Sequence, residues 1–330
     1  TLIGGLSGDA ITTGAQNTAV GTSALSANTT ASSNTAVGFQ AGFSNTTGSS
    51  NTAVGRKALL ANTTGHSNSA LGADLPGVVA GSALGANTTG LRNSAFGGSA
   101  LATNTTGSSN VAVGGAALHL NTTASNNTAV GYQAGYSNTT GQEITAVGRF
   151  ALNANTTGSN STATGVQSLQ SNTTGADNAS FGRLGLGANT TGSNNTSVGS
   201  AALRNNTTAG NNTAVGYQSL YDNTTGAQNT SVGFRSLYNN TTASNNAAFG
   251  QDALYSNTTG QYNVALGHST LVSNTTASNN TAVGYQSLYA NTTGTNNVAI
   301  GHEAGKAVTT GLENTIIGGA AGDALTDADF

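Results

Sequence analysis

The sequence predicts an all-β protein, a parallel β-solenoid or β-roll of about 19 coils with 17 residues in each coil. Three observations predict this fold: a motif that recurs at a fixed period, a glycine at a fixed place in each repeat, and too few apolar residues in one repeat for a core of its own. The segments that begin at Asn17, Asn34, Asn212 and Asn280 all read Asn-Thr-Ala-Val-Gly and carry Asn-Thr-Thr eleven residues later.

The repeats account for the whole chain, so we expect residues 1–330 to form a single array. A partial repeat covers residues 1–16, full repeats of 17 begin at Asn17, and regular repeats run over 93–330. An eight-residue insertion lies near 73–80, and its apolar Leu75, Val78 and Val79 suggest that it folds back on the array. Positions below are counted from the first Asn of each repeat.

The first element of each repeat is a short strand over Asn-Thr-Ala-Val-Gly. Position 5 is Gly in all 18 full repeats, which predicts a positive φ or a close approach that a Cβ would block. Position 4 is apolar in 17 of 18 repeats and position 9 is Leu in most of them. Since one Val and one Leu cannot offset the entropy of ordering 17 residues, the repeats must stack, with positions 4 and 9 forming the core.

The other two elements are less regular. Aromatic residues four apart, as at Tyr217 and Tyr221, predict a short helical or 3₁₀ turn, with a second strand as the alternative. The following Asn-Thr-Thr-Gly is a polar turn. Stacking at ~4.8 Å per coil would give a rod on the order of 90 Å long, with Asn at positions 1 and 12 hydrogen-bonded to their copies in the next coil.

Composition excludes several classes of protein. Charged residues make up 6% of the chain and the net charge is −3, so no basic surface for nucleic acid exists. No apolar run is long enough to insert into a membrane. No catalytic, cofactor-binding or metal-binding set stands out from the repeat, so we expect neither an enzyme nor a cofactor.

The Asn-Thr-Ala-Val-Gly strand and the small-residue turn after it resemble the head repeats of trimeric autotransporter adhesins. The longer motif, Tyr-Gln-Ala-Leu or Tyr-Gln-Ser-Leu followed by Asn-Thr-Thr-Gly, is similar to repeats of bacteriophage tail fibres and bacterial surface fibres. The resemblance covers the chain from Leu2 to Gly318. It implies a homotrimer at a cell surface or on a virion tail. The chain starts and stops in phase with the repeat, which suggests a fragment of a longer fibre or head-to-tail stacking.

Two sets of residues are candidate sites. The variable large residues at positions 6 and 10 are candidate contacts for a cell-surface polysaccharide or for a partner chain, and they include Tyr132, Tyr136, Tyr217, Tyr221, Phe234, Tyr238, Tyr285 and Tyr289. Asn-Thr-Thr is formally an N-glycosylation acceptor, although an Asn ladder is the better explanation of it. The candidate acceptors include Asn28, Asn45, Asn62, Asn104, Asn138, Asn223, Asn257 and Asn291.

These observations favour a structural fibre or filament module, a rigid extracellular or virion rod that acts as a spacer and in attachment. The first alternative is an adhesin that binds host polysaccharide through its aromatic residues. A minor alternative is an ice-binding solenoid, because regular Thr rows on a flat face can match a lattice.

Overall fold

A computed structural model describes residues 1–73 and 81–327, and it divides the chain into two compact parts. The first part comprises Thr1–Gln167 with Asn172–Thr174, and the second comprises Ser168–Ser171 with Gly175–Phe330. The expected insertion near 73–80 falls almost wholly outside the described residues, and so do Leu75, Val78 and Val79.

The first part holds β1 (Leu2–Ile3), β2 (Thr18–Val20), β3 (Thr35–Val37), β4 (Thr52–Val54), β5 (Ser69–Leu71), β6 (Ser94–Phe96), β7 (Val111–Val113), β8 (Thr128–Val130), β9 (Thr145–Val147) and β10 (Thr162–Thr164). The second part holds β11 (Ala179–Phe181), β12 (Thr196–Val198), β13 (Thr213–Val215), β14 (Thr230–Val232), β15 (Ala247–Phe249), β16 (Val264–Leu266), β17 (Thr281–Val283), β18 (Val298–Ile300) and β19 (Thr315–Ile317).

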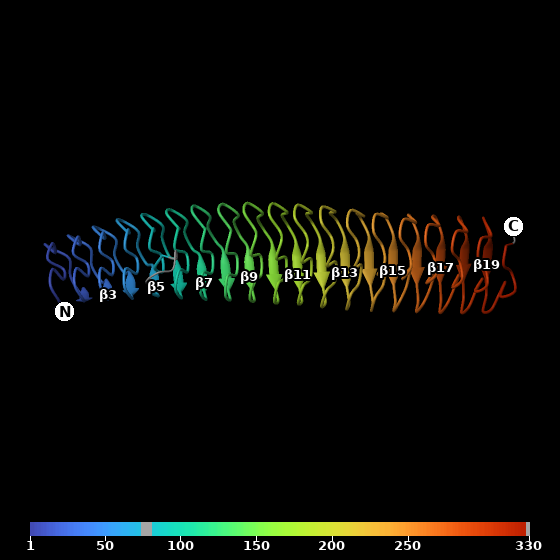
Figure 1. The fold of residues 1–330 in the computed structure, drawn as a ribbon, viewed down its shortest axis with the longest axis horizontal. Coiled ribbons are helices and arrows are strands. Elements are labelled where there is room, and N and C mark those ends of the chain that lie inside the picture. The colour runs from blue at the N-terminus through green and yellow to red at the C-terminus, as the bar shows by residue number, and fades with distance from the viewer. Residues whose placement is uncertain (74–80, 328–330) are drawn as a thin grey trace. The chain divides into compact units, whose positions relative to one another are not determined.

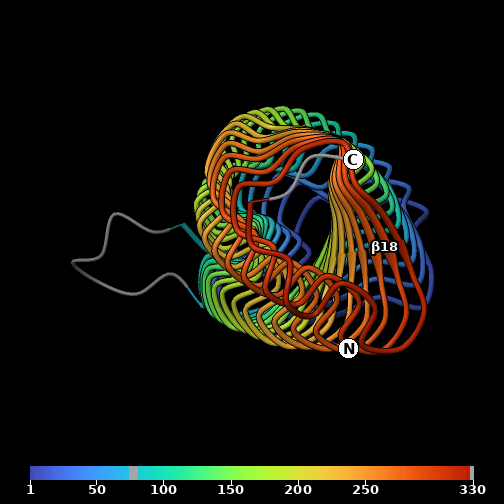
Figure 2. The same ribbon diagram turned by 90° about the vertical axis from the view of Figure 1, so that its right-hand side faces the viewer.

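Both parts are parallel β-solenoids in which each turn contributes one strand, as the sequence predicts. Consecutive strands within each part run parallel (Figure 1). Outside the insertion, each strand residue pairs with its copy 17 positions later, for example Thr213 with Thr230. The register survives the insertion, because Ser69 of β5 pairs with Ser94 of β6, 25 residues away. Seen along the stack, each turn is a loop with its strand on one side (Figure 2).

The strands have one buried and two outward-facing positions, because successive side chains alternate between the faces of a strand. Position 3, usually Ala, faces the interior and is fully buried at Ala36, Ala129 and Ala214. Positions 2 and 4 therefore point outward. The prediction that Val at position 4 belongs to the core is wrong, since Val37 and Val130 each keep 37% of their surface exposed.

Leu at position 9 fills the interior, as predicted. Leu118, Leu220 and Leu254 are fully buried, and they lie beside the small residues of position 3 and of position 8. The core is therefore narrow: in most turns one large side chain, the Leu of position 9, is buried together with alanines and asparagines.

The segment over positions 6–10 is neither a helix nor a strand. The prediction of a helical or 3₁₀ turn there is wrong, since the described residues of this segment form consecutive turns. The reason is a left-handed backbone at alternate residues, such as Gln218 (φ 53) and Leu220 (φ 53), which interrupts any right-handed helix. The N–H groups of these residues bond to different neighbours: Gln218 donates to Ser200 of the preceding turn and Leu220 to Ser236 of the following turn.

Glycine at position 5 meets both expectations of the sequence. Gly131 has a φ of 136°, and a Cβ there would lie 2.6 Å from the carbonyl oxygen of Gly148 in the next turn. No other residue satisfies this geometry without displacing the backbone.

Candidate interaction surfaces

The asparagines of positions 1 and 12 form two buried ladders inside each solenoid. Asn45 donates from its Nδ2 to Asn28 Oδ1 (3.0 Å) in the preceding turn and to the Gly48 carbonyl (2.8 Å) in its own. At position 1, Asn34 donates its backbone N–H to Asn17 Oδ1 (2.9 Å). The predicted Asn ladder is confirmed.

All eight candidate glycosylation asparagines belong to the position-12 ladder, and each is at most 1% exposed. Their amides are enclosed and hydrogen-bonded in the folded chain. N-glycosylation stays a prediction, and it would require that a sugar be added before the turn closes over the amide.

The aromatic residues of positions 6 and 10 stack between turns rather than within a turn. At position 10, Tyr238 stacks between Tyr221 and Tyr255 with ring centroids 5.1 and 5.3 Å apart. At position 6, Tyr217 stacks on Phe234 at 5.6 Å, and Tyr285 stacks between His268 and His302. The expectation that residues four apart share a helical face is therefore wrong: the two positions form separate rows along the solenoid.

The exposure of these rings differs between the rows. The position-6 rings of Tyr132 and Tyr217 are 54% and 48% exposed, whereas Tyr136, Tyr221 and Tyr238 are half-buried and Tyr289 is 36% exposed. Burial raises the pKa of Tyr238, and the nearby carboxylate of Asp222 raises it further.

Stacking leaves the inner rings of a row with mainly their edges exposed, because each neighbour covers a face. Sugar binding by aromatic residues relies on an open ring face. Polysaccharide binding through these residues stays a prediction. Even Phe234, which stacks on Tyr217, has the Arg235 guanidinium over its ring, 4.9 Å from the centroid.

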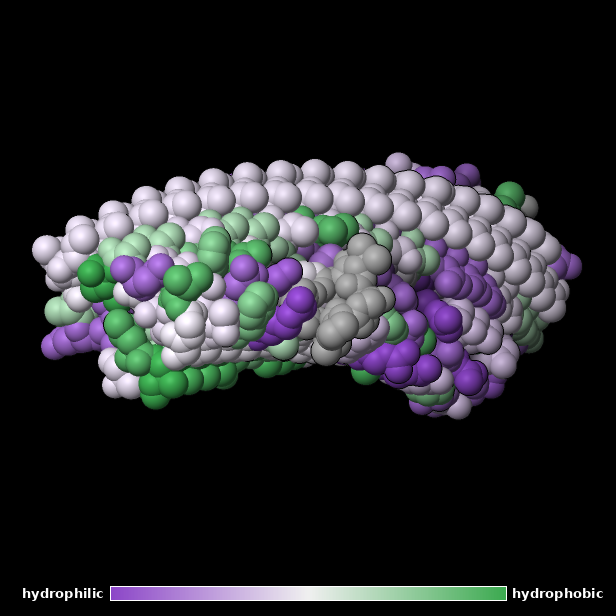
Figure 3. All heavy atoms as spheres, turned by 60° about the vertical axis from the view of Figure 1, so that its left-hand side comes forward, coloured by the Kyte–Doolittle hydropathy of each residue, from purple (hydrophilic) through white to green (hydrophobic). Residues whose placement is uncertain are grey.

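The outward row at position 4 is a continuous apolar surface that the sequence analysis placed in the core. In the second part this row contains only apolar side chains, and its exposed members are Phe181, Val198, Phe249, Leu266, Ile300 and Ile317, at 38–67%. No full repeat has a charged residue at position 2 or 4. Figure 3 shows apolar side chains gathered along one edge of the visible surface. The small residue at position 3 was the sequence signal that this position, and not position 4, faces the narrow interior.

A second outward row consists of threonine at position 14. This residue is exposed in each described turn where it occurs, from Thr30 to Thr310, while the Thr before it is half-buried. Sequence reasoning treated Asn-Thr-Thr as a turn signal and gave these hydroxyls no separate role.

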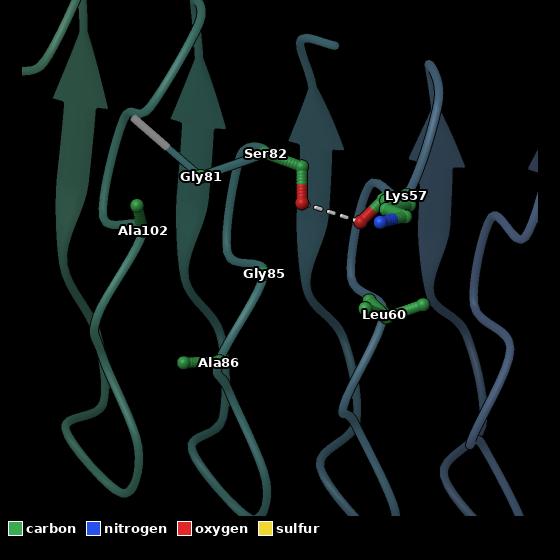
Figure 4. Close-up of a pocket in the computed structure, with 7 residues that line it drawn as sticks. All are labelled: Lys57, Leu60, Gly81, Ser82, Gly85, Ala86 and Ala102. Carbon is green, nitrogen blue, oxygen red and sulfur yellow. Dashed lines mark hydrogen bonds between the residues drawn. The ribbon is translucent and has the colours of Figure 1, made fainter. Parts of the chain in front are cut away.

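A shallow depression of about 290 Å³ lies beside the insertion, between Lys57, Leu60, Gly81, Ser82, Gly85, Ala86 and Ala102. Ser82 Oγ donates to the carbonyl oxygen of Lys57 in the preceding turn (2.5 Å), as Figure 4 shows. The described lining is mostly small and apolar.

Titratable side chains are scattered over the described residues. No group of three or more His, Asp or Glu among them could hold a metal ion. One close ion pair joins Lys306 Nζ to Glu303 Oε1 at 2.6 Å, and this contact lowers the pKa of Glu303 and raises that of Lys306. Across residues 1–73 and 81–327, no helix has the length and apolar character needed to cross a membrane.

No model of a protein family matches the chain, and a search of curated proteins finds no significant match.

Proposed function

We propose that the chain is a structural fibre module, a rigid spacer in an extracellular or virion fibre in which three copies lie side by side. The observation that carries the proposal is the turn-by-turn repetition of the same bonds. Within each part, successive turns are joined by strand pairing and by main-chain bonds outside the strand, such as Leu220 N–H to the Ser236 carbonyl (2.9 Å), and most turns add an Asn ladder bond.

This construction resists bending, because a bend would have to lengthen hydrogen bonds in all three places of a turn at once. Repeats in solenoids stabilise one another through their neighbours. A spacer needs these properties, and it needs no pocket.

The apolar row at position 4 supports lateral assembly. Soluble monomers rarely expose large contiguous apolar patches, and this row extends over all nine strands of the second part. Six of the nine side chains in this row are 38–67% exposed, and the row provides on the order of 500 Å² on one chain, a size typical of functional apolar patches. With the flanking rows at positions 2 and 6, this approaches the ~800 Å² that each partner contributes to a standard interface.

Imaging of the purified chain tests the fibre role. We expect negative-stain electron microscopy to show straight particles of uniform width, on the order of 90 Å long, from the ~4.8 Å rise of each turn. Small-angle scattering should give a cross-section that is constant along the particle. Round particles, or a chain that bends freely in solution, would contradict the proposal.

A further inference from the structure

The threonine row at position 14 has no structural explanation within the chain. Position 14 is Thr in 17 of the 18 full repeats, and Asp327 is the exception. In the described residues, one position-14 hydroxyl donates a hydrogen bond within the chain, that of Thr310 to Asp327 Oδ1 (2.9 Å), and Asp327 is the exception itself. In the middle of the second part, Thr225, Thr242 and Thr259 are exposed.

The neighbouring Thr at position 13 does have an internal role. Thr224 Oγ1 donates to the Thr241 carbonyl (3.0 Å), and Thr241 Oγ1 donates to the Thr258 carbonyl (3.2 Å). This bond recurs along both parts and explains why Thr is retained at position 13. It does not involve the hydroxyl at position 14.

Repeat duplication alone does not explain the constancy of position 14. Other exposed positions of the same repeats have diverged: position 6 holds Tyr217, Phe234, Gln251 and His268 in four successive turns. An exposed residue that stays the same while its exposed neighbours change has a role at the surface.

The row is also rigid and uncharged. The backbone N–H of Thr225 donates to the Thr241 carbonyl (3.3 Å), and that of Thr259 donates to the Thr275 carbonyl (3.2 Å), so the main chain beneath the row is tied to the next turn. Thr is β-branched and stiff at χ1, in contrast to Ser. Its hydroxyl can both donate and accept, and its methyl group is apolar. Weakly polar side chains repeat regularly over much of the surface visible in Figure 3.

Stacking sets the distance between these hydroxyls at ~4.8 Å, the separation of neighbouring strands. This repeat is close to that of the oxygen atoms along an axis of the basal plane of ice. A rigid row of hydroxyl and methyl groups at this spacing can hold water in ice-like positions, whereas long charged side chains would not. We propose that the position-14 threonine row is an ice-binding surface whose ligand is the ordered water of the ice crystal. The proposal is independent of the fibre role.

Thermal hysteresis and ice recrystallisation inhibition of the full chain, with ice itself as the probe, test the proposal. We expect a hysteresis gap and growth-arrested faceted crystals that a non-binding protein of equal concentration does not produce. The triple variant Thr225→Lys, Thr242→Lys, Thr259→Lys should lose at least half of the gap, since three adjacent charged side chains interrupt the row.

A control places three lysines on the position-6 row instead. Ser200→Lys, Gln251→Lys and His268→Lys alter position 6, where Arg183 occurs naturally, and this variant should retain the full gap. Circular dichroism establishes that both variants are folded. The proposal is overturned if the unaltered chain shows no gap, or if the folded position-14 variant matches the position-6 control.

Discussion

Leucine at position 9 combines a buried side chain with a left-handed backbone. Leu220 is fully buried at a φ of 53°, and Gly42 and Gly135 occupy the same position in other turns with φ near 60°. A left-handed conformation costs a non-glycine residue about 1–2 kcal/mol. Leu persists because the burial of its side chain offsets this cost. At Gly135 another large side chain lies nearby, since a Cβ there would be 3.6 Å from Ile144 Cδ1.

Truncation of Leu220 separates these two effects. We expect Leu220→Ala to lower the free energy of unfolding by about 3 kcal/mol, since it leaves a cavity and keeps the strained backbone. Leu220→Gly should cost no more than the Ala variant, although it removes one carbon more, because Gly relieves the strain. Denaturant unfolding followed by circular dichroism measures both. A Gly variant that is clearly less stable than the Ala variant would refute the role of strain.

The position-12 ladder makes a second prediction at the residue scale. Asn240→Val removes the donor to Asn223 Oδ1 (2.9 Å) and the acceptor of Asn257 Nδ2 (2.9 Å). Asn223 Oδ1 then has no donor, whereas Asn257 Nδ2 keeps its bond to the Gly260 carbonyl (3.0 Å). A buried group left without a partner costs about 1–3 kcal/mol, so we expect the free energy of unfolding to fall by about that amount and amide exchange to be faster in the adjacent turns.

The chain itself contains this substitution once. Val308 stands at position 12, and Asn291 Oδ1 in the turn before it is a buried atom that lacks a hydrogen-bond partner among the described residues. Asn291→Ala should therefore cost less than Asn240→Ala. Equal losses would show that the ladder bonds contribute nothing measurable.

At the scale of the element, the strand depends on the glycine that follows it. Gly131→Ala would require a φ of 136° and would place its Cβ 2.6 Å from the Gly148 carbonyl oxygen. We expect this variant to lower the free energy of unfolding by about 3 kcal/mol or more, because the backbone is strained and the next turn is displaced.

Position 15 of the same turn provides the control. A Cβ at Gly141 would also lie close to the next turn, at the Gly158 carbonyl. However, Ala occupies this position at Ala124 and Ala209 and is buried there, so small backbone shifts accommodate the methyl group. The free energy of unfolding of Gly141→Ala should differ by no more than about 1 kcal/mol from that of the natural chain. If Gly131→Ala and Gly141→Ala lose similar stability in thermal unfolding, the positive φ at position 5 does not distinguish it from position 15.

The tyrosine stack of position 10 predicts a dependence on pH. Burial raises the pKa of Tyr238 above 10.0, with Asp222 and the flanking tyrosines adding to the effect. The folded state thus favours the neutral phenol, and the stability from this preference is present below pH 10 and is lost as the pH rises through the raised pKa.

We expect the free energy of unfolding of the natural chain to fall more steeply above about pH 10 than that of Tyr238→Phe, which has no proton to lose. Denaturant titrations between pH 8 and 11 measure this slope. Parallel curves for the two proteins would contradict the assignment to Tyr238.

At the scale of the whole molecule, the exposed apolar row at position 4 predicts self-association. We expect mass photometry to show a species of three times the 32.1 kDa chain mass. Lysine at Val198, Val232 and Val283 would place three charges on this row and should shift the protein to a single chain. The same three charges on position 6, at Ser200, Gln251 and His268, should shift it much less. If the natural chain is monomeric at micromolar concentration, the proposed lateral assembly is contradicted.

The sequence by itself determined the repeat, the stacking and the parallel register, because these follow from the period of 17 and from the inability of one repeat to bury a core. It also determined the role of glycine at position 5 and the Asn ladder. Each of these depends on local geometry or on the stacking of identical residues, and a repeated sequence displays both directly.

Only the tertiary structure decided which side of each turn faces inward. Val at position 4 and Ala at position 3 are adjacent, and hydrophobicity alone favours Val for the core. The turn is so narrow that the interior accepts Ala at position 3 and Leu at position 9, and Val130 is left outside. The left-handed backbone at positions 7 and 9 was equally hidden, since Gln and Leu give no local signal for it. The closure of each turn imposes this left-handed backbone. The same closure places the aromatic, apolar and threonine side chains in separate rows on the surface.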